Sequence, residues 1–120
     1  MKMEFELKEL VGGKDSFMKL LNADLPIKVS YRLSKTIKKI EEELKHFDTQ
    51  RIELLKKYGE PIENGTKYQV KDLEGFNKDM NELLAEKVEI NVTTIDLKDI
   101  EKASLSAIDL SNLSKLIKEE

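Results

Sequence analysis

The chain has 120 residues, of which 38% are charged and 39% hydrophobic, and 21 basic against 24 acidic side chains give a net charge of −3. It contains no cysteine, which excludes a disulfide scaffold, a thiolate metal site and a cysteine nucleophile. The length favours a single domain over 1–120. No apolar run approaches the roughly 18 residues of a membrane span, and none follows Met1, so we expect neither a membrane segment nor a secretion signal.

The N-terminal third is predicted to hold one strand and one short helix. Residues 2–7 alternate charged and apolar side chains, and this period of two predicts a half-buried strand. Gly12 and Gly13 are expected to break the chain after Val11. A short amphipathic helix then begins at residue 14 or 15 and ends near Asn22–Asp24. Its apolar stripe consists of Phe17, Leu20 and Leu21.

The region from about 25 to 58 gives the clearest pattern. Pro26 fits a first helical turn, and no Gly or Pro interrupts the chain before Gly59. Its apolar residues are spaced alternately by four and three, which is a heptad seam with one polar member. The seam consists of Leu33, Ile37, Ile40, Leu44, Phe47, Arg51, Leu54 and Tyr58. These features predict one unbroken helix, roughly 50 Å long at about 1.5 Å per residue.

The next segment is predicted to fold back on the long helix. A turn over 63–66, with Asn-Gly at its centre, precedes a short alternating segment at 67–70, which indicates a small hairpin. Asp72 is a candidate N-cap for a second helix over about 72–87. Because the connection is short, we expect this helix to lie antiparallel along residues 44–58.

The C-terminal part is predicted to add a strand and a last helix. Strict alternation over 88–92 indicates a strand that pairs with residues 2–7. Ser106 and Asp109 form a pattern close to a capping box, which opens a helix over 106–118 that ends in Lys118-Glu119-Glu120. The predicted fold class is therefore mainly α with minor β, a long antiparallel helical hairpin with a small β-sheet and short terminal helices.

The seam leaves open what covers its N-terminal half, from Val29 to Ile40. The second helix is too short to reach it. The helix near 14–22, the helix at 106–118 or a second copy of the chain could supply the apolar cover. A homodimer through the long helix is thus one of three alternatives, since exposed apolar patches of that size are unusual in monomers.

The sequence offers few groups for catalysis. His46 is the only histidine, and it lies one helical turn from Glu43, but no second pair exists to complete a bundle metal site. No nucleophile elbow is present, and the Gly12-Gly13 pair lacks the Gly-Lys-Ser or Gly-Lys-Thr that ends a phosphate loop. We therefore expect no enzyme activity, no metal site and no cofactor.

A basic stripe is the best candidate for an interaction site. Lys28, Arg32, Lys35 and Lys39 are spaced four, three and four residues apart, which places them on one face of the long helix. The stripe is followed at once by Glu41-Glu42-Glu43, and only Tyr31 lies among the cations. Arg51 is a second candidate: its stem is expected to pack while its guanidinium reaches a carboxylate of the chain or of an acidic partner.

The order of five segments resembles a family of small proteins of unknown function encoded by temperate bacteriophages and prophages. The segments are Leu25–Lys35, Leu54–Gly59, Gly75–Lys78, Val88–Ile90 and Leu105–Leu110. The resemblance covers nearly the whole chain, and it implies a phage protein in the cytoplasm of a bacterial host. It implies no activity, substrate or catalytic residue.

We therefore predict a non-catalytic protein that binds another phage or host protein, as an accessory or assembly factor. The first alternative is a phage inhibitor of a host defence or replication protein. The second is a nucleic-acid-binding accessory protein that uses the basic stripe, although we do not expect nucleic acid to be the main partner because the chain is acidic overall.

Overall fold

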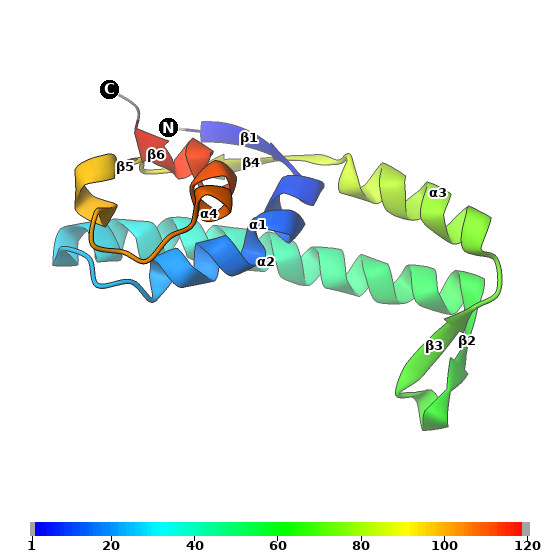
Figure 1. The fold of residues 1–120 in the computed structure, drawn as a ribbon. Helices are drawn as coiled ribbons and strands as arrows, with labels where there is room; N and C mark the ends of the chain where they lie inside the picture. The colour runs from blue at the N-terminus through cyan, green and yellow to red at the C-terminus, as the bar shows by residue number, and fades with distance from the viewer. Residues whose placement is uncertain (1, 119–120) are drawn as a thin grey trace.

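The protein is elongated, with principal extents of 49 × 27 × 24 Å, in a computed structural model that describes residues 2–118 (Figure 1). It is mainly helical, with three small two-stranded sheets. The helices are α1 (Leu7–Leu21), α2 (Ile27–Tyr58), α3 (Leu73–Leu84) and α4 (Ala107–Asn112). The strands are β1 (Lys2–Glu6), β2 (Gly59–Ile62), β3 (Lys67–Val70), β4 (Lys87–Asn91), β5 (Ile95–Asp96) and β6 (Ile117–Lys118). Three short 3-10 turns, η1 (Glu63–Gly65), η2 (Leu97–Ile100) and η3 (Ser114–Leu116), complete the chain.

Helix α1 begins at Leu7, directly after β1, so the predicted break at Gly12 and Gly13 is wrong. Both glycines lie inside the helix. An internal glycine costs about 1 kcal/mol relative to alanine, and the burial of Leu7 and Leu10 on the same face offsets that cost. Gly13 is itself buried, and a Cβ added there would lie 3.1 Å from the Phe17 ring, so its small size leaves room for that buried ring.

The long helix is confirmed as one continuous element, α2, of 32 residues. The N-terminal half of its seam is covered: Leu33, Ile37 and Ile40 are each 1% exposed, and Val29 is half-buried against the same core. The cover comes from within the chain, since α1 and β4 contact α2 and the C-terminal residues Leu113 and Leu116 join the same core. The argument for a second copy over residues 29–40 therefore loses its basis.

The sheets hold distant segments together. β1 and β4 are antiparallel, with Met3 opposite Ile90 and Phe5 opposite Val88, the pairing expected from their alternation. β2 and β3 form a separate hairpin, whose turn places Asn64 and Gly65 in the left-handed region at φ 58° and 84°. β5 and β6 are parallel.

The predicted C-terminal helix over 106–118 is too long, because α4 ends at Asn112. Its start is as expected, with a complete capping box between Ser106 and Asp109. After α4 the chain turns through η3, which buries Leu113 and Leu116, and β6 then pairs with β5. The apolar contacts and the strand pairing outweigh local helix propensity here. Residues 119 and 120, at the expected Lys118-Glu119-Glu120 end, lie outside the described residues.

The molecule divides into two regions that differ in burial. We call residues 48–86 the arm and the remaining described residues the body. The arm contains the last third of α2, the β2–β3 hairpin and α3. Helix α3 is shorter than the predicted 72–87 and is capped by the Asp72 side chain. Figure 1 shows the hairpin and α3 extending from one end of the body. None of the arm residues is fully buried.

Candidate interaction site at the start of α2

The structure brings three of the five predicted interaction residues together. Lys28, Arg32 and Lys35 lie on the first turns of α2 and line one shallow surface hollow of about 480 Å³. Lys39 continues the same helical face one turn further on, where its Nζ lies 3.8 Å from a carboxylate oxygen of Glu42. Arg51 does not belong to this group. It lies in the arm, half-buried, with its Nε 3.4 Å from Asp48 Oδ1, so its charge is matched within the chain.

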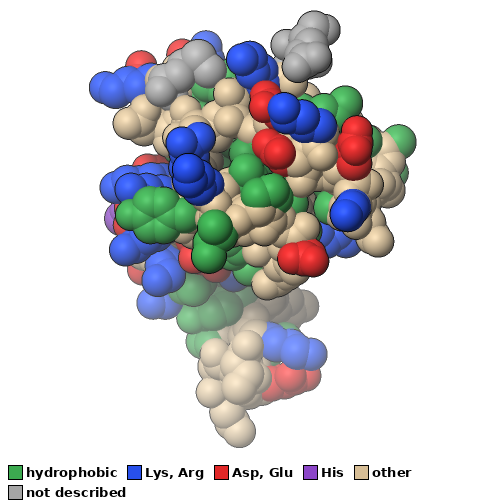
Figure 2. Space-filling model, turned by 90° about the vertical axis from the view of Figure 1, so that its left-hand side faces the viewer, with side chains coloured by type: hydrophobic (Ala, Val, Ile, Leu, Met, Phe, Trp, Pro, Cys, Tyr) green, Lys and Arg blue, Asp and Glu red, His purple; other side chains and the backbone are tan. Residues whose placement is uncertain are grey.

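Two apolar side chains complete the hollow. Ile27 is 84% exposed and Tyr31 is 62% exposed, although both are large and both belong to the α2 helix. The Nζ of Lys35 lies 4.5 Å from the centroid of the Tyr31 ring, within the range of a cation–π interaction. Figure 2 looks at this end of the molecule and shows hydrophobic side chains among Lys and Arg side chains. We call Ile27, Lys28, Tyr31, Arg32, Lys35 and Lys39 the basic face.

The sequence reasoning found the cations and Tyr31 but missed Ile27. A signal was available, because Ile27 and Tyr31 are four residues apart and so share a face that is not the heptad seam. An apolar pair of this kind on the outer side of a helix indicates either a contact or a binding surface. Only the exposed fractions show that, within the part of the chain described, no other segment covers the pair.

The basic face concentrates positive charge. Among residues 2–118, no carboxylate lies within 4 Å of the charged groups of Lys28, Arg32 or Lys35, as the ion pairs of the chain lie elsewhere. The first turn of α2 has no acidic residue, and Pro26 gives no side-chain cap. The partial positive charge of the helix N-terminus therefore adds to the side-chain charges. Cations at this end lower the stability of the helix by about 0.3–1 kcal/mol.

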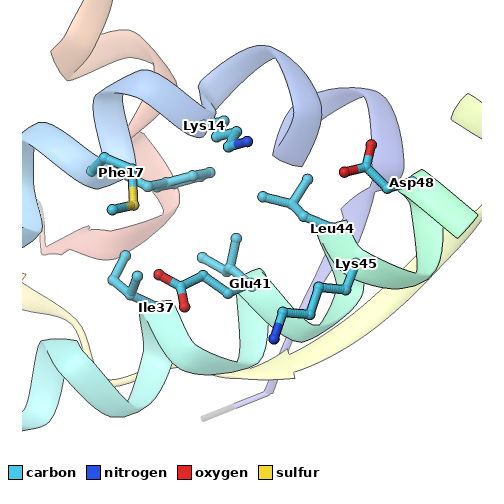
Figure 3. Close-up of a pocket in the computed structure, with 9 residues that line it drawn as sticks. Lys14, Phe17, Ile37, Glu41, Leu44, Lys45 and Asp48 are labelled. Atoms are coloured by element: carbon cyan, nitrogen blue, oxygen red, sulfur yellow. The ribbon is translucent and has the colours of Figure 1, made fainter. Parts of the chain in front are cut away.

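A second hollow lies between α1 and α2 and has a volume of about 260 Å³ (Figure 3). Its floor includes Phe17 and Ile37, which belong to the core and are 2% and 1% exposed. Charged residues surround it, namely Lys14, Glu41, Lys45 and Asp48. The volume is below the roughly 300–1,000 Å³ of a typical ligand cavity, so this hollow fits a single apolar side chain rather than a cofactor.

The Asp109 carboxylate joins α4 to α1 through several hydrogen bonds. Its Oδ1 accepts a hydrogen bond of 2.7 Å from Ser16 Oγ, and its Oδ2 accepts bonds from the Ser106 N–H at 3.0 Å and from Lys19 Nζ at 3.2 Å. The Ser106 backbone donor, followed by Ser16, holds the pKa of the Asp109 carboxyl far below its ordinary value of 3.8. Asn112 donates to Ser16 Oγ in turn.

These hydrogen bonds hold α4 against α1, and their geometry does not suit hydrolysis. Ser16 is 3% exposed, so a substrate cannot reach it, and its hydroxyl donates a hydrogen bond to the Asp109 carboxylate, whose lowered pKa makes it too weak a base to activate a nucleophile. The histidine that a triad would require, His46, is exposed on α2. The sequence predicted the Ser106–Asp109 cap, but nothing in the local pattern linked Asp109 to Ser16.

Both a pair of potential metal ligands and a long helix occur among the described residues. Glu43 and His46 are neighbours on α2, but within 2–118 no group of three or more His, Asp or Glu side chains lies close enough to hold a metal ion. No helix in that range combines the length and the apolar character needed to cross a bilayer.

Comparison with protein-family models, with curated proteins and with solved structures gives no match for this chain.

Proposed function

We propose that this is a non-catalytic protein that binds another protein through the basic face. The observation that carries the proposal is the exposure of Ile27 and Tyr31 beside three cations without acidic partners. Tyrosine and arginine are enriched among the residues that dominate binding energy, and apolar anchors with a polar surround are the usual anatomy of a docking surface.

The biological setting of the proposal is a temperate bacteriophage in the cytoplasm of its host. The order of the five segments named above supports this setting. Within it we propose an accessory or assembly factor, with an inhibitor of a host defence or replication protein as the alternative. Both roles use binding alone. They differ in genetics: loss of an assembly factor blocks particle formation in every host, whereas an inhibitor is dispensable in hosts that lack its target.

The arm is proposed to act as an antiparallel helical hairpin that extends the body. Contacts between α2 and α3 support this arrangement, as does the 2.6 Å hydrogen bond that Tyr58 Oη donates to Asp79. Its half-buried apolar side chains offer a second, weaker contact surface. The basic face remains the primary site because it combines exposed anchors with unmatched charge.

Site-specific photo-crosslinking in phage-producing cells tests the proposal. A photoreactive residue replaces Tyr31 in one variant and Lys67 on the β2–β3 hairpin in a matched control. We expect one defined protein adduct at position 31, absent at position 67, and lost when Arg32→Glu and Lys35→Glu are added. An equal yield at both positions, or no adduct at position 31, would contradict the proposal.

Nucleic-acid binding is kept as a second candidate function because of one observation, the cation held over an exposed aromatic ring. Bases stack on such rings in single-strand-binding proteins. It predicts salt-sensitive retention of DNA or RNA that Arg32→Glu with Lys35→Glu abolishes. The net charge of −3 and the acidic run after Lys39 weigh against it.

A further inference from the structure

We infer that the basic face recognises an acidic amphipathic α-helix of about three turns, supplied by another protein. This inference rests on the proposed function and names the chemistry of its partner. It follows from the length of the stripe, the spacing of its charges and the place where the charge reverses.

The cations form a short straight row. Lys28 and Lys39 are 11 residues apart on one continuous helix, which corresponds to roughly 16 Å at about 1.5 Å per residue. The intervals of four, three and four keep all four cations on one side of α2. A partner helix packed alongside, with carboxylates at the same intervals, would place one acidic group near each cation, because both helices share the same rise.

The apolar anchors require more than charge from the partner. Ile27 and Tyr31 are one turn apart and lie in the same hollow as Lys28, Arg32 and Lys35. A partner that carried only carboxylates would leave these two side chains in water. An amphipathic helix with an apolar residue on each turn beside its acidic row would cover them, and such anchors at i and i+4 are typical of helix recognition.

The charge reversal argues against a polyanion. Glu41, Glu42 and Glu43 begin two residues after Lys39 and end four residues after it, and all three are exposed or half-exposed. A nucleic acid strand that continued along α2 would meet these carboxylates, whereas a three-turn helix ends before them. The aliphatic Ile27 also offers nothing that a phosphate backbone can use.

A second copy of the chain is a poorer occupant. Helix α3 carries three carboxylates, Glu74, Asp79 and Glu82, but they are spaced five and three residues apart and so do not match the intervals of the cations. Asp79 accepts hydrogen bonds from Tyr58 Oη and Lys57 Nζ of its own chain, so it is already matched. The inference therefore assigns the basic face to a different protein.

Fluorescence anisotropy with defined probes tests the inference on the full chain. The first probe is an 18-residue helical peptide with Glu at intervals of four, three and four and Leu beside each Glu. The second has the same composition but carries Glu and Leu on opposite faces. The third is an 18-nucleotide single-stranded DNA. We expect the chain to bind the first probe at least tenfold more tightly than either of the others. Its affinity for the first probe should fall at least tenfold between 50 and 500 mM salt.

Matched variants locate the binding. Arg32→Glu with Lys35→Glu should reduce the affinity for the first peptide at least tenfold, and Tyr31→Ala at least threefold. Lys67→Glu with Lys71→Glu changes the net charge equally, at the exposed β2–β3 hairpin, and should leave the affinity within twofold. Circular dichroism checks that each variant remains folded. The inference would be overturned if the hairpin variant lost as much affinity for the first peptide as the Arg32→Glu with Lys35→Glu variant.

The remaining outcomes separate this inference from the function on which it rests. Tighter binding of DNA than of the first peptide would overturn both. Equal binding of the two peptides, or self-association of the chain that the Arg32→Glu and Lys35→Glu changes abolish, would overturn the acidic-helix assignment. A protein adduct at position 31 in cells together with no peptide binding would leave the docking function standing and reject only the assigned partner chemistry.

Discussion

The body and the arm are built from the same long helix but are stabilised in different ways. Every fully buried hydrophobic side chain among residues 2–118 lies in the body, from Phe5 to Phe47 and from Ile90 to Leu116. The arm continues the same heptad seam with Leu54 and Tyr58, yet these residues are only half-buried. One amphipathic pattern therefore gives a packed core where several elements converge and a thin contact where a single helix covers it.

The difference matters for the candidate site. The basic face lies on the part of α2 whose opposite side is packed in the body core, so its side chains project from a rigid support. The arm depends on local contacts, including the Tyr58–Asp79 hydrogen bond and the close approach of Gly75 to Tyr58. We expect hydrogen exchange to be faster in α3 than in the first half of α2.

The largest expected effect comes from opening the body core. Ile37→Ala removes a side chain that is 1% exposed, and it should lower the free energy of unfolding by about 2–5 kcal/mol. Met80→Ala in the arm removes a half-buried side chain and should cost less than half as much. Urea unfolding of both variants measures the difference. Equal losses would show that the arm is as tightly packed as the body.

Acid should weaken the body through Asp109. Its pKa is lowered in the folded protein, so its contribution to stability is present above the ordinary value of 3.8 and is lost as the pH falls below that value. Asp109→Asn should therefore reduce stability at neutral pH and flatten its dependence below about pH 4. Thermal unfolding between pH 2 and 7 measures both effects.

Tyr58→Phe is the matched change in the arm. Tyr58 Oη is the main cause of the lowered pKa of Asp79, so its removal should also flatten the acid dependence, in the same direction but with a smaller amplitude. A larger amplitude for Tyr58→Phe than for Asp109→Asn would contradict the assignment of the stronger polar link to the body.

Gly59→Ala should loosen the arm and leave the body intact. A Cβ at residue 59 would lie 2.7 Å from the Gln69 carbonyl oxygen and 2.8 Å from that of Leu55, and neither backbone atom can move without disturbing β3 or the end of α2. We expect a loss of about 1–3 kcal/mol, as for other overpacked sites. Hydrogen exchange should speed up at β2 and β3, with protection of α1 unchanged.

The smallest expected effect is an increase in the stability of the body. Gly12→Ala adds a methyl group in the exposed middle of α1, with no atom within 4 Å, and should stabilise the protein by about 0.5–1 kcal/mol. Gly13→Ala is the control, because its Cβ would lie 3.1 Å from the Phe17 ring, so the same gain should not appear. Urea unfolding distinguishes the two, and a loss for Gly12→Ala would show that α1 needs flexibility there.

Much of the fold could be predicted from local pattern, and the failures have a shared cause. Period-two alternation located β1 and β4, and the heptad spacing located α2. The Gly12–Gly13 pair and the stretch after Asn112 were predicted wrongly, because in both places long-range packing outweighs local preference: α1 continues through its glycines beside α4, and the chain after α4 bends to bury Leu113 and Leu116.

The candidate site shows the same division. The spacing of Lys28, Arg32 and Lys35 alone placed them on one helical face, because an α-helix fixes the direction of side chains three and four residues apart. Whether Ile27 beside them would be covered depended on where α1, η2 and the sheets pack, which no local pattern encodes. The sequence by itself thus determined the long helix and its row of cations. Only the tertiary structure decided that the seam is covered in the body and half-covered in the arm. It also decided that Ile27 and Tyr31, beside the cations, are left in water.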